Sequence, residues 1–164
     1  MHFSEGDRLR VEHWEYMYFA NSVEVKEDSL RFEGDFTGFW INFSKRRLMA
    51  FGISETQAAE LAPKISQHMN ENYKPFVEIP EEIPMILTLL QEAGYILAVV
   101  SNRETPFNEE LKDLGIDSYF NFTLAAGEVG AFKPDAPIFL RALEMAGVSA
   151  DEALYIGDNY FADI

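Results

Sequence analysis

The sequence predicts an α/β protein in which a helical region precedes a parallel, Rossmann-like, three-layer core. Two observations lead to this fold class. Residues 1–78 carry apolar side chains at helical spacing. From residue 79 onward, helical stripes alternate with short apolar runs, the order that produces a parallel sheet with right-handed crossovers. Since an all-helical segment does not fit that alternating pattern, we expect residues 1–78 to form a helical cap region and residues 79–164 a partial α/β core.

Two aromatic-rich stripes predict helices within region 1–78. Their members are Val11, Trp14 and Tyr18 in the first stripe, and Phe36, Phe39, Trp40 and Phe43 in the second. We interpret both stripes as packing surfaces. The alternative is that one or two of these aromatic side chains face a substrate. The acidic stretch 22–35, which contains Gly34, is expected to be a loop or a frayed helix end.

The last helix of the cap region has its own start signal. Ser54 and Gln57 form a capping box, and an apolar stripe follows them. Pro63 lies inside this helix and is expected to kink or restart it. The basic run 45–47 is interpreted as a solvated helix face rather than a binding patch.

Three apolar runs predict the strands of the core. They span residues 95–100, 120–125 and 153–156. A helical stripe over residues 83–90 precedes the first run, and the segment after Lys133 predicts a helix that ends at Gly147. Between the first two strands, Thr105 and Pro106 are expected to supply the N-cap and the first-turn proline of another helix.

Polar side chains follow each predicted strand. Ser101 and Asn102 follow the first, Lys133 lies in the loop after the second, and Asp158 and Asp163 follow the third. Because ligands bind beyond the carboxyl ends of parallel strands, we expect these groups to gather at one sheet edge. A hydroxyl and backbone N–H groups can hold phosphoryl oxygens, an ammonium can neutralise their charge, and carboxylates can bind Mg2+. The ordinary alternatives are that Ser101 caps a helix, that Lys133 is a surface lysine and that Asp158 is a turn residue. The order and spacing of these residues after the apolar runs favour a site.

Composition limits the partners. A net charge of -15 argues against nucleic acid or an anionic membrane as the main partner. No apolar run approaches the ~20 residues of a membrane span, and the first residues lack the layout of a signal peptide. The absence of cysteine excludes a disulfide framework, a zinc-thiolate site and a thiol nucleophile, and it fits a cytoplasmic location. The three histidines, at positions 2, 13 and 68, form no visible ligand cluster.

Three segments resemble the second, third and fourth motifs of the haloacid dehalogenase-like (HAD) hydrolases. They are residues 99–103 (VVSNR), 130–139 (GAFKPDAPIF) and 155–163 (YIGDNYFAD). The resemblance is to the branch with a helical cap, and it covers roughly residues 36–164. The set of motifs is specific for the superfamily and uninformative about the substrate.

The resemblance implies a role for each candidate residue. Ser101 would bind the phosphoryl group together with the backbone N–H of Asn102. Lys133 would stabilise the nucleophile and its phosphorylated form. Asp158 would bind Mg2+ directly, and Asp163 would support the metal site or Lys133. The presence of Asp158 favours phosphate ester hydrolysis over carbon–halogen cleavage, because dehalogenating members replace this acid and need no metal.

The family's first motif, a strand followed by Asp-x-Asp-x-Thr or Val, is absent from the sequence. Asp7 follows no apolar run, and Asp35 has the wrong spacing and no strand before it. The resemblance therefore implies an incomplete core that lacks its central strand and its aspartate nucleophile. We expect the chain to be an internal fragment of a longer enzyme and to be inactive by itself.

The function expected from the resemblance is Mg2+-dependent hydrolysis of a small phosphorylated metabolite through an aspartyl-phosphate in the full-length protein. One alternative is a non-catalytic binding or regulatory module that keeps the pocket. A second is a dehalogenase or phosphotransferase on the same scaffold. A phosphate-accepting receiver domain is disfavoured, because it has no helical cap. Substrate identity and oligomeric state stay open.

Overall fold

The computed structural model describes residues 2–20, 22–73 and 77–163, which divide into two compact units. The helical unit contains the described residues up to Tyr73, and residues 159–162 are grouped with it. The α/β unit contains residues 77–158 and Asp163. Within the described ranges, no helix combines the length and the apolar character that crossing a bilayer requires.

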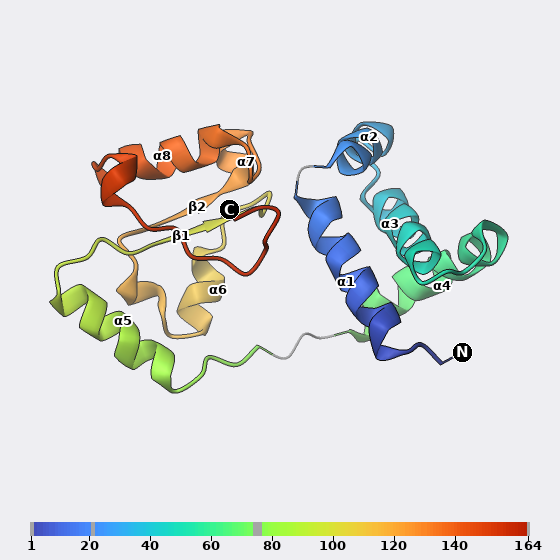
Figure 1. Ribbon diagram of the computed structural model, residues 1–164, viewed down its shortest axis with the longest axis horizontal. Coiled ribbons are helices and arrows are strands. Elements are labelled where there is room, and N and C mark those ends of the chain that lie inside the picture. Colours follow the sequence, from blue (N-terminus) through green and yellow to red (C-terminus); the bar gives the residue numbers. More distant parts are fainter. Residues whose placement is uncertain (1, 21, 74–76, 164) are drawn as a thin grey trace. The chain divides into compact units, whose positions relative to one another are not determined.

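Four helices form most of the helical unit. They are α1 (Glu5–Phe19), α2 (Val23–Arg31), α3 (Phe36–Ala50) and α4 (Glu55–Asn72) (Figure 1). Each begins after a polar residue whose side chain accepts a hydrogen bond from a backbone N–H three residues later, as N-caps do. These caps are Ser4, Ser22, Asp35 and Ser54. The predicted start of the last helix is confirmed, and α4 continues without restarting at Pro63.

The expectation that residues 22–35 form a loop is wrong, because α2 occupies most of this stretch. Ser22 caps it, and the side chain of Asp28 is only 2% exposed. The Tyr18 hydroxyl donates a hydrogen bond to Asp28 at 2.9 Å, and Arg46 Nη2 donates another at 2.9 Å. These two donors compensate the buried carboxylate, so an acidic sequence packs as a helix.

The interpretation of the basic run 45–47 also needs correction. Lys45 pairs with Glu55 at 2.7 Å, Arg46 pairs with the buried Asp28, and Arg47 pairs with Glu15. The interpretation as a solvated face is therefore wrong for Arg46, since its guanidinium binds an acid inside the unit. Long-range pairing of this kind leaves no periodic signal in the sequence.

The α/β unit contains a two-stranded parallel sheet. Strands β1 (Ala98–Ser101) and β2 (Phe122–Ala125) pair in parallel from Ala98–Phe122 to Ser101–Ala125. The helices of the unit are α5 (Glu82–Glu92), α6 (Asn108–Asp113), α7 (Ala126–Val129) and α8 (Ala136–Ala146). Two 3-10 turns lie at Asp117–Tyr119 and Ala150–Glu152.

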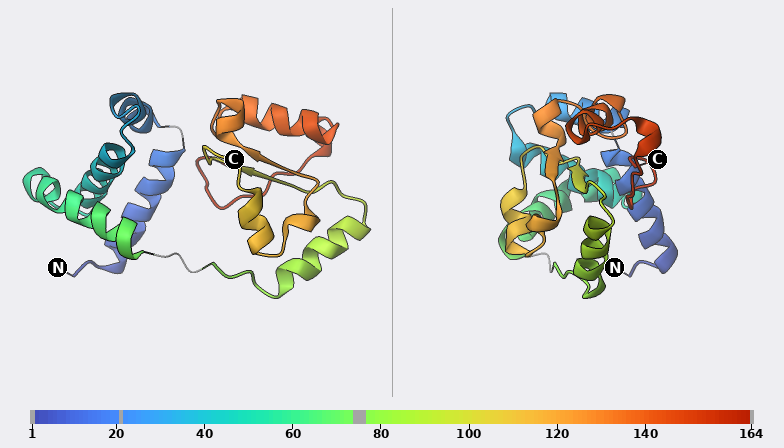
Figure 2. Two further views of the ribbon diagram at one scale, coloured as in Figure 1. Left: turned by 180° about the vertical axis from the view of Figure 1, so that it is seen from behind. Right: turned by 90° about the vertical axis from the view of Figure 1, so that its left-hand side faces the viewer.

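Helices cover both faces of this sheet, which gives the predicted three layers. Figures 1 and 2 show α7 and α8 on one face and α5 and α6 on the other. Alternate strand residues point to opposite faces. Ala125 packs in the cluster of Phe107, Leu111 and Ile116 on the α6 side. Its neighbour Leu124 packs with Ile138 on the α8 side.

Two local predictions in this unit need correction. The first strand is shorter than residues 95–100, because Tyr95 and Ile96 are exposed and pairing starts at Ala98. Helix α6 starts at Asn108 with Phe107 at the N-cap, so Thr105 is not its cap. Phe107 itself is 5% exposed and packs in a cluster with Leu111 and Ile116.

The predicted strand over residues 153–156 does not form. The side chains of Leu154 and Ile156 are 86% and 83% exposed, and the segment has no strand assignment. A strand requires a neighbour that satisfies its backbone groups. Within the described residues, no backbone hydrogen bond pairs 153–156 with another strand. The apolar pattern therefore identified a strand-like segment but not a partner for it.

Candidate active site

The candidate site lies at the carboxyl end of β1, where the strand ends and polar loops begin. Ser101 is the last residue of β1 and is half-buried, and Asn102 follows it directly. Within the described residues, the Ser101 hydroxyl is not engaged in any hydrogen bond between side chains or with the backbone. The hydroxyl is therefore available to a ligand oxygen, and its predicted phosphoryl-binding role stays a prediction.

Asn102 attaches the Lys133 loop to the end of β1. Its Nδ2 donates to the Lys133 carbonyl at 2.9 Å, and its Oδ1 accepts from the Lys133 backbone N–H at 2.6 Å. Two hydrogen bonds from one amide fix both position and orientation of the loop. The side chain of Asn102 thus has a positioning role that the sequence did not reveal.

Lys133 is a buried cation with two close partners. The residue is 8% exposed, and its Nζ lies 2.5 Å from Asp163 Oδ1 and 2.7 Å from the Tyr155 hydroxyl. The Nζ lies 5.2 Å from the centroid of the Tyr155 ring, at the hydroxyl end of that side chain. The structure therefore brings together Lys133 and Asp163, two of the predicted site residues.

These contacts keep the ammonium protonated. Burial by itself lowers the pKa of Lys133, but the hydrogen bonds to Asp163 and Tyr155 outweigh it, and the net pKa is raised. Burial also raises the pKa of the Tyr155 hydroxyl, against the opposing effect of the neighbouring ammonium. The pair thus consists of a charged lysine and a neutral tyrosine, an arrangement that can bind an anion.

Tyr155 is a site residue that the sequence reasoning missed. Its hydroxyl donates to the Val100 carbonyl at 3.1 Å, and its ring packs edge-on against Phe139 at 5.2 Å. The available signal was a lone tyrosine within the apolar run 153–156. A tyrosine hydroxyl that becomes buried requires a hydrogen-bond partner.

The two predicted metal ligands have different surroundings. The Asp163 side chain is 3% exposed and pairs with Lys133. It packs directly against Gly157, where an added Cβ would lie 2.2 Å from Asp163 Oδ2. Asp158 is exposed. The structure thus gives the two acids separate environments.

The donor chemistry at Asp158 and Asp163 suits Mg2+, which prefers carboxylate oxygens. Asp163 already neutralises Lys133, so Asp158 is the carboxylate exposed to an incoming ion. Across residues 2–20, 22–73 and 77–163, no three acidic or histidine side chains converge as a ready-made metal site. The assignment of both acids to Mg2+ stays a prediction, and further ligands would have to come from water, substrate or other residues.

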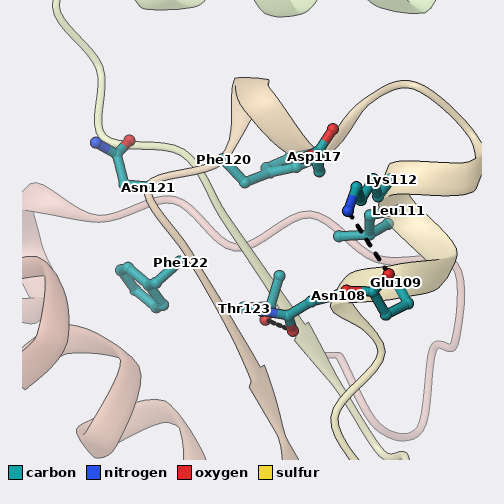
Figure 3. Close-up of a pocket in the computed structure, with 9 residues that line it drawn as sticks. All are labelled: Asn108, Glu109, Leu111, Lys112, Asp117, Phe120, Asn121, Phe122 and Thr123. Atoms are coloured by element: carbon teal, nitrogen blue, oxygen red, sulfur yellow. Dashed lines mark hydrogen bonds and ion pairs between the residues drawn. The ribbon is translucent and has the colours of Figure 1, made fainter.

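A cavity of about 240 Å³ in the α/β unit lies apart from this site. Figure 3 shows its lining, in which the Thr123 hydroxyl donates to Asn108 Oδ1 at 2.6 Å and Lys112 faces Glu109. None of the predicted site residues lines it. A second cavity of about 350 Å³, in the helical unit, is lined by Phe36, Trp40 and Phe43 among others, so these aromatic side chains do not only pack against one another.

Comparison with known proteins finds relatives named as haloacid dehalogenase-like proteins or as phosphatases. A haloacid dehalogenase-like hydrolase domain-containing protein 3 from Mus musculus is 34% identical over 113 residues, 68% of this chain and 44% of that protein. A phosphoglycolate phosphatase from Aquifex aeolicus is 28% identical over 73% of this chain and 57% of its own length. A glyceraldehyde 3-phosphate phosphatase from Methanopyrus kandleri is 37% identical over 56% of this chain and 38% of its own length.

The chain spans about half the length of these curated relatives. The sequence model of the haloacid dehalogenase-like hydrolases matches residues 23–164, which is most of the chain. This match includes the strand β1, the Lys133 loop and the terminal acidic segment that build the site. The chain therefore belongs to the haloacid dehalogenase-like hydrolase family.

Proposed function

We propose that the protein containing this chain is a Mg2+-dependent phosphatase that hydrolyses a small phosphate monoester. The observation that carries the proposal is the buried Lys133 ammonium, held by Asp163 and Tyr155 and attached by Asn102 to the end of β1. Two relatives whose names specify phosphatase activity support the same reaction class. A small phosphorylated metabolite is the proposed substrate class.

Ser101, Lys133 and Asp158 would each have a different role toward the phosphoryl group. The free Ser101 hydroxyl would donate to one phosphoryl oxygen, and the Lys133 ammonium would stabilise negative charge that develops during transfer. Asp158 would contribute an oxygen ligand to Mg2+, which when bound offsets the phosphoryl charge. No Asp-x-Asp motif follows an apolar strand in these 164 residues. The attacking aspartate would therefore come from outside this sequence.

The test is phosphate release from p-nitrophenyl phosphate by the longest reading frame that contains this chain, with Mg2+ present. We expect turnover that EDTA abolishes, and a loss of about 10²–10³-fold in Lys133→Met, the size of effect expected when one charge-stabilising donor is removed. Lys112→Met is the control, since Lys112 is an exposed lysine of the same unit whose Nζ lies 3.8 Å from Glu109.

Three outcomes would count against the proposal or its assigned site. A folded protein that releases no phosphate under these conditions would favour the binding-module alternative. Release of halide from a 2-haloacid, with no phosphatase activity, would favour the dehalogenase. Equal losses in Lys133→Met and Lys112→Met would show that the effect does not come from the site.

A further inference from the structure

We infer that Tyr155 is a positioning residue, which directs the Lys133 ammonium toward the anion that binds beside Ser101. The inference rests on the proposed function only for the identity of that anion. Three contacts carry it: the Tyr155 hydroxyl accepts from Lys133 Nζ at 2.7 Å, donates to the Val100 carbonyl at 3.1 Å, and belongs to a ring that packs on Phe139.

The hydroxyl links the lysine to the sheet. Val100 lies in β1, one residue before Ser101, so its carbonyl has a fixed position relative to the predicted phosphoryl-binding hydroxyl. The chain of hydrogen bonds runs from Lys133 Nζ to Tyr155 and on to Val100. A tyrosine hydroxyl can accept one bond while donating another, and a phenylalanine ring can do neither.

The ring itself is held from the other side. Phe139 of α8 contacts it edge-on, with the two ring planes at 89°. The Lys133 ammonium lies at the hydroxyl end of the same side chain, 5.2 Å from the ring centroid. Tyr155 is thus fixed by α8 and by β1, although its own segment forms no strand. A fixed tyrosine can orient a flexible lysine side chain, which otherwise samples many rotamers.

Asp163 and Tyr155 have separate effects on the lysine. Asp163 supplies the opposite charge, at 2.5 Å, and the Tyr155 hydroxyl supplies a second, neutral acceptor at 2.7 Å. An ammonium carries three protons. Two are directed to these acceptors, and no further acceptor for the third is present among the described residues. With two directions fixed, the third N–H has a defined direction for an anionic ligand.

The experiment observes the Lys133 ammonium directly in the 164-residue chain, by ¹H–¹⁵N NMR of ¹⁵N-labelled lysine. The signal is assigned through its loss in Lys133→Met. In Tyr155→Phe we expect its protons to exchange with water about tenfold faster, because a hydrogen bond to a charged group contributes about that factor to an equilibrium. In the control Tyr95→Phe, where the tyrosine is 63% exposed, the rate should not change.

An unchanged exchange rate in a folded Tyr155→Phe chain would overturn the inference, because a tyrosine that only packs loses nothing when its ring is kept. If that variant does not fold, the hydroxyl proton of Tyr155 is observed in the unmodified chain with ¹³C-labelled tyrosine. A slowly exchanging proton supports the bond to Val100, and rapid exchange overturns it.

Titration with inorganic phosphate separates this inference from the proposed function. If both hold, phosphate shifts the Lys133 ammonium signal of the unmodified chain, and Tyr155→Phe binds it about tenfold more weakly. A chain that shows slow ammonium exchange but no response to phosphate contradicts the phosphate site alone. Equal phosphate affinity in the unmodified chain and in Tyr155→Phe overturns the positioning role.

Discussion

Two buried charges of the described residues, Asp28 and Lys133, are each held by a tyrosine hydroxyl as well as by an opposite charge. Asp28 of the helical unit accepts from Tyr18 and Arg46, and Lys133 of the α/β unit donates to Tyr155 and Asp163. Burying an ion requires compensation from every side that has lost water. A tyrosine supplies one hydrogen bond and a large apolar surface at the same time.

Tyr18 is expected to make the helical unit less stable at alkaline pH. Burial, followed by the hydrogen bond to Asp28, raises the pKa of its hydroxyl well above the ordinary value of 10.0. Because the folded pKa is raised, the stabilisation is fully present below pH about 10, where the unfolded tyrosine begins to ionise, and is lost as the pH rises further. We expect the thermal midpoint of the unmodified chain to decrease as the pH is raised above about 10. Circular dichroism measures this midpoint.

Tyr18→Phe should have a lower midpoint at neutral pH and a smaller fall above pH 10. The matched control is Tyr73→Phe, because Tyr73 is 58% exposed and belongs to the same unit. Parallel pH profiles for Tyr18→Phe and the unmodified chain would show that the hydroxyl of Tyr18 does not produce the alkaline transition.

Among the elements, α7 shows how a short helix shapes the loop beside the site. It has four residues, Ala126–Val129, and Glu128 caps it by accepting from the Ala125 backbone N–H at 2.8 Å. The Gly127 N–H donates to the Arg103 carbonyl at 3.1 Å, which brings α7 against the loop that follows β1. Gly130, with φ of 69°, ends the helix in the left-handed region.

Gly127→Ala should destabilise the α/β unit. A Cβ at this position would lie 1.8 Å from the Glu104 carbonyl oxygen, a backbone atom that cannot move without displacing the loop. We expect a loss of about 1–3 kcal/mol in the free energy of unfolding, the usual cost of forcing extra atoms into a packed position. Urea unfolding measures it.

The control for this substitution is Gly6→Ala in the first turn of α1, where an added Cβ has its nearest neighbour at 3.8 Å. There the better helix propensity of alanine should leave stability unchanged or raise it by up to ~1 kcal/mol. A Gly127→Ala chain as stable as the unmodified one would mean that α7 and the Glu104 loop separate at little cost.

At the scale of the whole chain, the apolar side chains divide unevenly between core and surface. Val11, Ile138 and Leu124 are buried, while Leu154 and Ile156 are 86% and 83% exposed. Clustered apolar residues beside an unpaired strand edge promote association between molecules. The terminal segment is therefore the part of this chain that we expect to limit its solubility.

The double substitution Leu154→Ser with Ile156→Ser should raise the solubility of the chain without lowering its thermal midpoint. The two residues are 86% and 83% exposed, so little packing is lost and both substitutions remove apolar area from the surface. Static light scattering measures the association, and Leu124→Ser, at a residue only 4% exposed, serves as the destabilising control. A fall in the midpoint of the double variant similar to that of the control would show that these side chains are packed in solution.

The structure brings two of the predicted site residues, Lys133 and Asp163, into contact, and it adds connections that the sequence analysis did not contain. The family resemblance implied that Asp163 supports either the metal site or Lys133, and in the structure Asp163 pairs with Lys133. The amide clamp of Asn102 and the bridging hydroxyl of Tyr155 could not be foreseen, because each bond joins residues 22 to 55 positions apart. Specific hydrogen bonds at such separations depend on the packed geometry and produce no local pattern.

Local sequence was sufficient for the features that neighbouring residues control. N-caps, helical stripes, the αL glycine after α8 and the apolar runs each express a preference within a few positions. Tertiary structure alone decided whether those preferences were realised. The acidic stretch 22–35 became a helix because Tyr18 and Arg46 compensate Asp28, and residues 153–156 stayed outside the sheet for want of a paired strand within the described chain. Burial and pairing are properties of partners distant in sequence, so they appear only once the chain has folded.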